Sequence, residues 1–283
     1  MRINTNVQSL NAQEAATNTN NNLRNSLEKL SSGLRINKAS DDASGLAIAD
    51  KLRTQASSIG QSIANGNSAT ALTQIADKAM AEQSNILDIV KQKLIQAATA
   101  TTSSEGREAI GKDINKLLTQ LDNIATQTNY NGISLLQGAS AGVGSTKLDF
   151  QMGEKAANTI ALGSGIQSNT KGLDGMSALK VSAAAASWSA GDARGHMKSV
   201  DSALNTLNAW RSDVGSTQNQ LESALRNMMT QKTNIKAAES VIRDVDYAAE
   251  SANFNKQNIV AQAGTYAMSQ SNAIQQNVLR LLQ

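Results

Sequence analysis

A heptad of mostly apolar positions runs almost unbroken through residues 200–242, and this feature most constrains the fold. Its positions step by four and three residues in strict alternation: Val200, Leu204, Leu207, Arg211, Val214, Gln218, Leu221, Leu225, Met228, Lys232 and Ile235, with Ile242 resuming the frame. This period predicts a long helix that packs lengthwise against other helices. The polar members Arg211, Gln218 and Lys232 either fix the register of that packing or face solvent at the helix edge.

The composition favours long helices over a wide globular core. The 283 residues include no proline, which would remove an intrahelical donor, and only 2% aromatic residues. The absence of cysteine excludes disulfides and thiolate metal sites. A net charge of +3, with both signs interspersed, does not indicate a nucleic-acid partner.

The first half of the chain repeats the helical period. Apolar stripes at helical spacing predict one helix from residue 45 to about 99, with a slip of the frame near Gly66, and a second over 110–124. The polar turn at 99–106 is short, which implies that the two helices are antiparallel neighbours. Ser40 or Asp41 is the expected N-cap of the first helix.

Residues 138–175 are rich in glycine and change period. Leu148, Phe150 and Met152 alternate with polar residues, and Ile160 and Leu162 do the same. A period of two predicts short strands, here paired as a β-hairpin. The last long helix of the central part is expected to begin between residues 177 and 196.

Both ends of the chain have a weaker amphipathic helical pattern than the middle. Because the two ends resemble each other in this way, we expect them to pair. We therefore expect a mainly α fold, a long antiparallel helical coiled-coil bundle with a small β-hairpin region and terminal helices paired into a coiled coil. The expected division is 1–42 with 246–283 as terminal helices of an inner core, 43–137 with 177–245 as a rigid bundle, and 138–176 as a hairpin and surface region.

No group of side chains forms a recognisable catalytic, metal or cofactor site. The single histidine, His196, has only Asp192 near it on a helix face, and the carboxylates Asp244, Asp246 and Glu250 are better interpreted as a helix cap or contacts of Arg243. We expect no enzyme activity, no metal and no cofactor. The sequence shows neither a cleavable signal nor a membrane span.

Several segments, taken together and in order, resemble bacterial flagellin, in a short form that lacks large outer domains. They are INTNV at 3–7, LNA at 10–12, LEKLSSGLRIN at 27–37, DDASGLAIA at 41–49, TNYNG at 128–132, SVIRDVDYA at 240–248 and QNVLRLL at 276–282.

The resemblance implies a structural subunit that polymerises into the flagellar filament for swimming motility. It implies export in the unfolded state by the flagellar type III apparatus, without a cleaved signal, to an extracellular filament. The implied partners are further copies of the chain, an export chaperone, and cap and junction proteins. The alternative is a hook–filament junction-type coiled-coil adaptor, which would not form long filaments alone.

The expected polymerisation core lies on the terminal helices, where one apolar set pairs with the other. These residues are Val7, Leu10, Leu23, Leu27 and Leu30 at one end, and Ile259, Ala263, Ile274, Val278 and Leu281 at the other.

Two surface properties also follow from the resemblance. The positions that match the family's segment for Toll-like receptor five are Ile89, Lys93 and Asp113, where the family carries Arg, Leu and Glu, so we expect weak receptor binding. The candidate glycan acceptors are hydroxyl residues of the hairpin region: Ser140, Ser145, Thr146, Ser164, Ser168 and Thr170.

Overall fold

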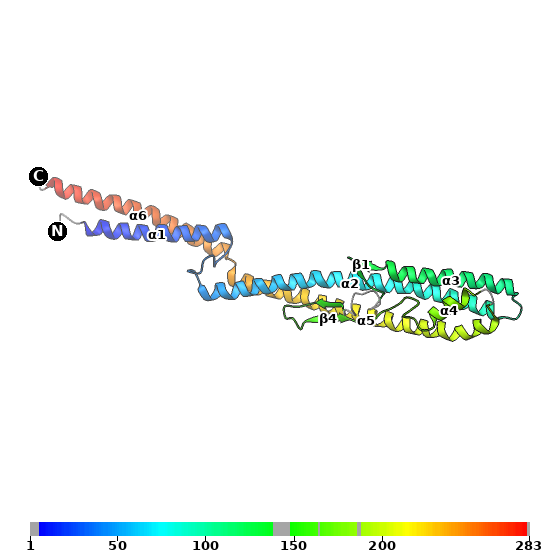
Figure 1. Ribbon diagram of the computed structural model, residues 1–283. Coiled ribbons are helices and arrows are strands. Elements are labelled where there is room, and N and C mark those ends of the chain that lie inside the picture. Colours follow the sequence, from blue (N-terminus) through cyan, green and yellow to red (C-terminus); the bar gives the residue numbers. More distant parts are fainter. Residues whose placement is uncertain (1–5, 138–147, 164, 186–187, 282–283) are drawn as a thin grey trace. The chain divides into compact units, whose positions relative to one another are not determined.

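The computed structural model describes residues 6–137, 148–163, 165–185 and 188–281. Its helices are α1 (Val7–Ser32), α2 (Ala43–Ala98), α3 (Ser104–Gln127), α4 (Met176–Ala183), α5 (Ala190–Arg243) and α6 (Tyr247–Leu281) (Figure 1). Its strands are β1 (Asn129–Tyr130), β2 (Ile133–Ser134), β3 (Leu148–Gln151) and β4 (Thr159–Leu162). The chain divides into two compact units, 1–57 with 233–283 and 58–232. The predicted fold class is confirmed.

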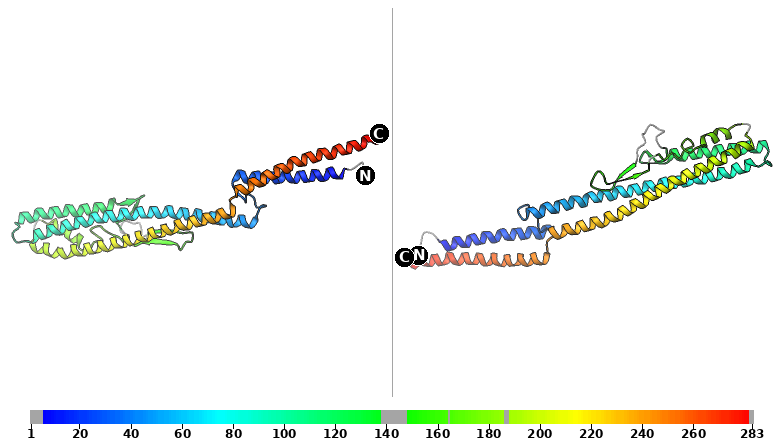
Figure 2. Two further views of the ribbon diagram at one scale, coloured as in Figure 1. Left: turned by 180° about the vertical axis from the view of Figure 1, so that it is seen from behind. Right: turned by 90° about the horizontal axis from the view of Figure 1, so that it is seen from below.

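The larger unit is built on three long helical stretches, from α2, α3 and α5, that lie side by side (Figures 1 and 2). The antiparallel direction of α2 and α5 follows from two ion pairs. Lys91 Nζ lies 2.5 Å from Asp201 Oδ1, and Arg211 Nε lies 3.1 Å from Asp77 Oδ1, so rising numbers on one helix meet falling numbers on the other. The polar heptad member Arg211 is thus paired at the edge of this interface.

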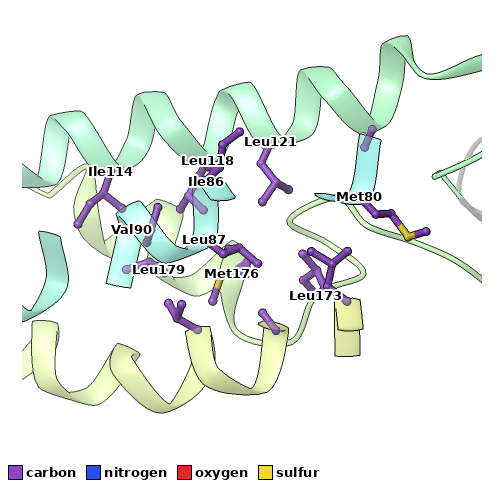
Figure 3. Packing of buried hydrophobic residues seen from close by; sticks show 14 of the residues in the cluster. Met80, Ile86, Leu87, Val90, Ile114, Leu118, Leu121, Leu173, Met176 and Leu179 are labelled. Carbon is purple, nitrogen blue, oxygen red and sulfur yellow. The ribbon is translucent and has the colours of Figure 1, made fainter. Parts of the chain in front are cut away.

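The predicted heptad supplies the α5 side of the core. Its members that are buried within the larger unit are Val200, Leu207, Val214, Leu221, Leu225 and Met228. Figure 3 shows Ile114, Leu118 and Leu121 of α3 opposite Leu87 and Val90 of α2 in the same apolar cluster. Because Ala, Val and Leu fill this interface, the helices need few aromatic side chains between them.

The segment that returns from the hairpin to α5 closes the core, which the sequence did not predict. Leu173, Met176 and Leu179 are each at most 1% exposed and belong to the same apolar cluster (Figure 3). The 8-residue α4 is too short to show a clear period, and its N-cap Gly175 offers no side-chain signal. Burial of its apolar face, rather than intrinsic propensity, accounts for this helix.

The expected hairpin is present as β3 and β4. Leu148 pairs with Leu162, and Phe150 pairs with Ile160, in an antiparallel ladder. A second, smaller hairpin joins β1 to β2 through Asn131 and Gly132, whose φ angles are 51° and 80°. Both residues occupy the left-handed region, as a two-residue Asn–Gly turn requires.

Helix α2 begins after Asp42, one or two residues later than the expected cap. Asp42 Oδ1 accepts a hydrogen bond from Gly45 N at 2.9 Å, so Asp42 is the N-cap. Asp41 instead accepts from Asn37 N at 3.1 Å and Lys38 N at 2.9 Å, which orders the preceding turn. The expectation of Ser40 or Asp41 failed because Asp41 satisfies donors before the helix rather than within it.

Candidate assembly surface of the terminal helices

Helices α1 and α6 lie side by side and antiparallel in the terminal unit (Figures 1 and 2). At one end of the pair, Ser9 Oγ donates to Asn272 Oδ1 at 3.0 Å. At the other end, Val245 N donates to Gly33 O at 3.0 Å. The predicted pairing of the terminal helices is therefore confirmed.

The two segments that lead into the terminal helices are tied together by backbone hydrogen bonds. Leu34 and Asp244 form an antiparallel bridge, and Arg35 N donates to Arg243 O at 2.6 Å. The Arg35 guanidinium also donates to Ile242 O at 2.6 Å. These contacts, which we call the clasp (residues 33–35 and 242–245), fix the register in which α1 meets α6.

Mostly small and polar side chains, with a few larger apolar ones, line the surface between α1 and α6. The inward stripe of α1 steps by three and four residues: Ser9, Ala12, Ala16, Thr19, Leu23, Ser26 and Leu30 are its half-buried or buried members. The matching stripe of α6 is Glu250, Phe254, Gln257, Ala261, Gly264, Met268 and Ser271. Small residues at such positions allow close approach of the two helices but bury little apolar area. On α1 the stripe is a heptad in which alanine, serine and threonine outnumber leucine, and this signal was present in the sequence.

Most of the predicted polymerisation core lies elsewhere on these helices. Leu23 and Leu30 are on the inward stripe, whereas Leu27 and Ala263 are exposed. Several other large apolar side chains also remain in solvent, with exposed fractions of 53% for Val7, 54% for Leu10, 67% for Ile259, 76% for Tyr266 and 52% for Ile274. The side chains of Val278 and Leu281 lie outside the described residues. In the isolated subunit the α1–α6 interface is therefore not built from these two sets, and their contact with each other in a polymer stays a prediction.

The paired helices leave much of their apolar surface exposed to solvent. Ser26 is the one buried residue of α1, and no described side chain of α6 is fully buried. A fully buried Leu or Ile contributes about 1.5–3 kcal/mol relative to an exposed one, so this pair gains little from its own packing. An exposed apolar set on both helices marks a surface that another protein surface can cover.

Two of the candidate carboxylates, Asp246 and Asp192, cap helices. Asp246 Oδ1 accepts from Ala248 N at 3.0 Å and from Ala249 N at 3.2 Å at the start of α6. Asp192 accepts from Ser189 N and Oγ at the start of α5, and these hydrogen bonds lower the pKa of its carboxyl, with a smaller contribution from His196.

Within the described residues, no group of three or more His, Cys, Asp or Glu side chains is arranged to hold a metal ion. No helix in the described part of the chain is long and apolar enough to cross a membrane.

The three receptor-equivalent positions lie on α2 and α3. Lys93 Nζ and Asp113 Oδ2 form an ion pair of 2.9 Å, and its hydrogen bond lowers the pKa of the Asp113 carboxyl. Ile89 is 42% exposed. Of the three receptor-equivalent positions, Lys93 and Asp113 are therefore paired with each other, and the first, Ile89, presents an apolar side chain.

The candidate glycan acceptors divide into two groups. Ser168 and Thr170 are 0% and 5% exposed, and Thr170 Oγ1 donates to Asp122 Oδ2 at 3.0 Å. Neither hydroxyl is accessible in the folded chain, because the returning segment packs over the core, so the prediction is corrected at these two positions. Ser140, Ser145, Thr146 and Ser164 lie outside the described residues.

Comparison with known proteins matches both helical regions of the chain. Residues 3–141 match the bacterial flagellin N-terminal helical region, and residues 197–282 match the C-terminal helical region. Over the whole length of both chains, the sequence is 34% identical to flagellin of Bacillus subtilis (strain 168). The chain belongs to the bacterial flagellin family. It is also 32% identical to the flagellar filament 33 kDa core protein of Treponema phagedenis, again over the full length of both.

The fold is shared with a more distant solved structure. That protein, described as a flagellar hook-associated protein from Vibrio parahaemolyticus, superposes with a TM-score of 0.59, covers 72% of this chain and 99% of its own, and is 12% identical. Flagellins are structural proteins of the extracellular flagellar filament, and this chain is a filament subunit of that class. In this flagellin the exposed apolar surface of α1 and α6 is the candidate for contacts between subunits.

Proposed function

We propose that this flagellin polymerises with itself through the outward faces of α1 and α6 into the filament used for swimming. The observation that supports this proposal is the exposed apolar set Val7, Leu10, Ile259, Tyr266 and Ile274. These side chains point away from the α1–α6 interface, so an isolated subunit does not bury them. Repetition of a head-to-tail contact that does not close produces an open helical polymer, in which every subunit covers the same surface of its neighbour.

Seeded polymerisation of an Ile259→Asp variant tests this proposal. Ile259 is 67% exposed, so a charge there leaves the fold of the monomer intact but places an unpaired carboxylate in the proposed contact. We expect monomers with unchanged helical content that fail to extend short filament seeds in negative-stain microscopy. The matched control is Ile259→Val, which keeps an apolar side chain and should extend the seeds. Long filaments from the Asp variant would refute the role of this face.

The same experiment on the unmodified chain separates the filament subunit from the adaptor. A filament subunit extends the seeds into long uniform filaments, whereas a hook–filament junction-type adaptor stops at short assemblies. The protein described as hook-associated is only 12% identical, so its similarity shows the fold alone and does not favour the adaptor. The full-length similarity to filament proteins at 32% and 34% identity favours the filament subunit.

We further propose that the chain leaves the cell unfolded through the flagellar type III apparatus, with no cleaved signal, assisted by an export chaperone. The absence of cysteine and proline supports this route, since no disulfide or prolyl isomer delays unfolding or refolding. The cap and junction proteins would then meet the same terminal helices. N-terminal sequencing of secreted protein tests the point: an intact start at Met1 or Arg2 is expected, and removal of a longer segment would contradict it.

Recognition by Toll-like receptor five is proposed to be weak. The first matching position carries Ile89 instead of a cation, and the cation at the second, Lys93, is engaged by Asp113 at 2.9 Å. Loss of a central charged anchor at an interface typically costs about 2 kcal/mol or more. A reporter-cell assay should show weak activation by this chain and stronger activation by Ile89→Arg combined with Lys93→Leu. Strong activation by the unmodified chain would overturn this proposal.

A further inference from the structure

The sequence contains two Asn–Gly dipeptides, Asn65–Gly66 and Asn131–Gly132, and the structure places them in opposite environments. The first lies inside the 56-residue helix α2. The second forms the two-residue turn between β1 and β2, where Asn131 and Gly132 are both exposed. An exposed and a protected copy of one dipeptide in the same chain allow the effect of structure to be separated from that of sequence.

We propose that Asn131 is a site of spontaneous deamidation, a covalent modification that accumulates as the folded chain ages. In this reaction the Gly132 amide nitrogen attacks Cγ of Asn131, a nitrogen–Cγ bond forms, and the Cγ–Nδ2 bond breaks. Nδ2 leaves as ammonia, taking up the proton released from the amide nitrogen. Water then adds to one of the two carbonyl carbons of the succinimide ring and opens it to aspartate or isoaspartate. Water is the only co-reactant, and no oxidant or reductant takes part.

The surroundings of Asn131 leave the reacting atoms accessible. A Cβ built at Gly132 would meet no heavy atom within 4 Å, so nothing packs against the attacking residue. The ladder that holds the turn has two residue pairs, Asn129 with Ser134 and Tyr130 with Ile133. Such a short two-stranded hairpin opens at low cost, and opening frees the chain to rotate into the geometry of attack.

The surroundings of Asn65 oppose the same reaction. Its side-chain oxygen accepts from Gln61 Nε2 at 3.0 Å, and its Nδ2 donates to Gln151 O at 3.3 Å. Gly66 is buried, and a Cβ at this position would lie 2.7 Å from Leu225 Cδ2. Attack at Asn65 therefore requires local unfolding of a long packed helix, which costs far more than opening the β1–β2 turn.

The product would change the local structure as well as the charge. Isoaspartate places an extra carbon in the backbone of a turn whose two central residues hold φ angles of 51° and 80°. The chain enters the core directly after β2, where Leu135 and Leu136 are 6% and 0% exposed. Leu136 O also accepts from Ser168 N at 3.0 Å, so a shift of β2 is resisted by the returning segment. We therefore expect the modification to disrupt the β1–β2 pairing without unfolding the helices.

Peptide mapping of the full-length chain tests the proposal. Purified protein is aged in mildly alkaline buffer, digested, and analysed by mass spectrometry for conversion of the amide to the acid and by an isoaspartate-specific methyltransferase. In the folded chain we expect conversion at Asn131 to be at least about tenfold faster than at Asn65, equivalent to about 1.4 kcal/mol in the opening cost. In concentrated denaturant the two rates should become similar, which shows that both peptides can report the reaction.

An Asn131→Ser variant is the matched control and should abolish the signal from this peptide while leaving the Asn65 peptide unchanged. Equal rates at the two positions in the folded chain would overturn the proposal. So would a folded chain that shows no conversion at Asn131 when the denatured chain shows it.

Discussion

Gly111 and Gly195 both lie inside helices, but one touches the core and the other faces open space. A Cβ at Gly111 would come within 2.6 Å of Ala183 O and 3.3 Å of Trp188 Cε3, whereas a Cβ at Gly195 would meet nothing within 4 Å. The first contact involves backbone, which cannot yield as a flexible side chain can. Gly111 is therefore a packing requirement, because α3 approaches the C-terminal end of α4 and Trp188 at this point.

The two glycines predict opposite responses to the same substitution. We expect Gly111→Ala to destabilise the protein by about 1–3 kcal/mol through overpacking. Gly195→Ala should stabilise it by about 0.5–1 kcal/mol, since alanine is the better helix former. Urea denaturation followed by circular dichroism measures both. A Gly111→Ala variant as stable as the unmodified chain would show that the approach of Ala183 is not tight.

Asp122 is the residue that ties α3 to the returning segment. It accepts from Thr170 N at 2.8 Å, Thr170 Oγ1 at 3.0 Å and Lys180 Nζ at 2.7 Å. Partial burial raises the pKa of this carboxyl, but hydrogen bonds from Lys180 and Thr170 lower it more, so the pKa lies below its usual value. The folded state therefore binds this proton more weakly than the unfolded state does.

Because folding lowers the pKa of Asp122, we expect the protein to lose stability in acid. The contribution of Asp122 is fully present above its pKa in the unfolded chain and is lost as the pH falls through its lower pKa in the folded chain. We expect Asp122→Asn to cost about 1–3 kcal/mol at neutral pH and to flatten the acid limb of the stability curve. Urea midpoints across the acid range for both proteins check this. An acid limb of unchanged slope in the variant would show that Asp122 does not contribute to it.

At the scale of the elements, the start of α2 depends on one side chain. Asp42 Oδ1 accepts from Gly45 N at 2.9 Å, and a Cβ at Gly45 would lie 2.5 Å from Asp42 Oδ2 and 2.7 Å from Ile36 Cδ1. The absence of a side chain at residue 45 thus allows both the cap and the burial of Ile36. Within the terminal unit, this turn connects α1 to α2 next to the clasp.

Removal of the cap should be measurable. We expect Asp42→Ala to lower the free energy of unfolding by about 1 kcal/mol, within the range observed for N-cap substitutions. Asp42→Ser, which can still accept from the helix backbone, is the matched control and should recover most of the loss. Thermal unfolding by circular dichroism compares the three proteins, and equal midpoints for the Ala and Ser variants would contradict the capping role.

At the scale of the whole molecule, the two units differ in how much apolar surface they bury. The cluster of the larger unit contains many fully buried side chains, such as Leu87, Ile114 and Leu207. The pair α1–α6 rests on an interface of mostly small, half-buried residues and on the backbone hydrogen bonds of the clasp. Since burial of apolar surface offsets the entropy lost on ordering, the terminal pair should open at much lower cost than the core of the larger unit.

Limited proteolysis of the monomer tests this difference. We expect early cleavage within 7–32 and 247–281 and long survival of a fragment that contains residues 58–232. Assembly into filaments should protect the termini, because the outward apolar faces then become covered. Cleavage that begins inside α3 or the heptad of α5 would contradict this order of stability.

The sequence by itself determined the long helices, the turn between α2 and α3 and the β3–β4 hairpin, although this turn ends at Ser103 rather than at residue 106. Their periods extend over enough residues to define the apolar face. The heptad of α5 supplies buried residues to the core, and Phe150 of β3 pairs with Ile160 of β4. The resemblance carried by the terminal segments also led to the family, since those segments are long and occur in order.

The tertiary structure alone decided which face each terminal helix uses and where α4 forms. The apolar residues singled out from the sequence suggested one pairing face, yet the clasp sets a register in which Ala16 and Gly264 lie on the inward stripes and Ile259 lies outside. Helix α4 is recognisable only through the core it closes. A weakly amphipathic helix can pack through more than one face, and a short segment can form a helix or a loop. In both cases the outcome depends on the surfaces that the rest of the chain offers for packing.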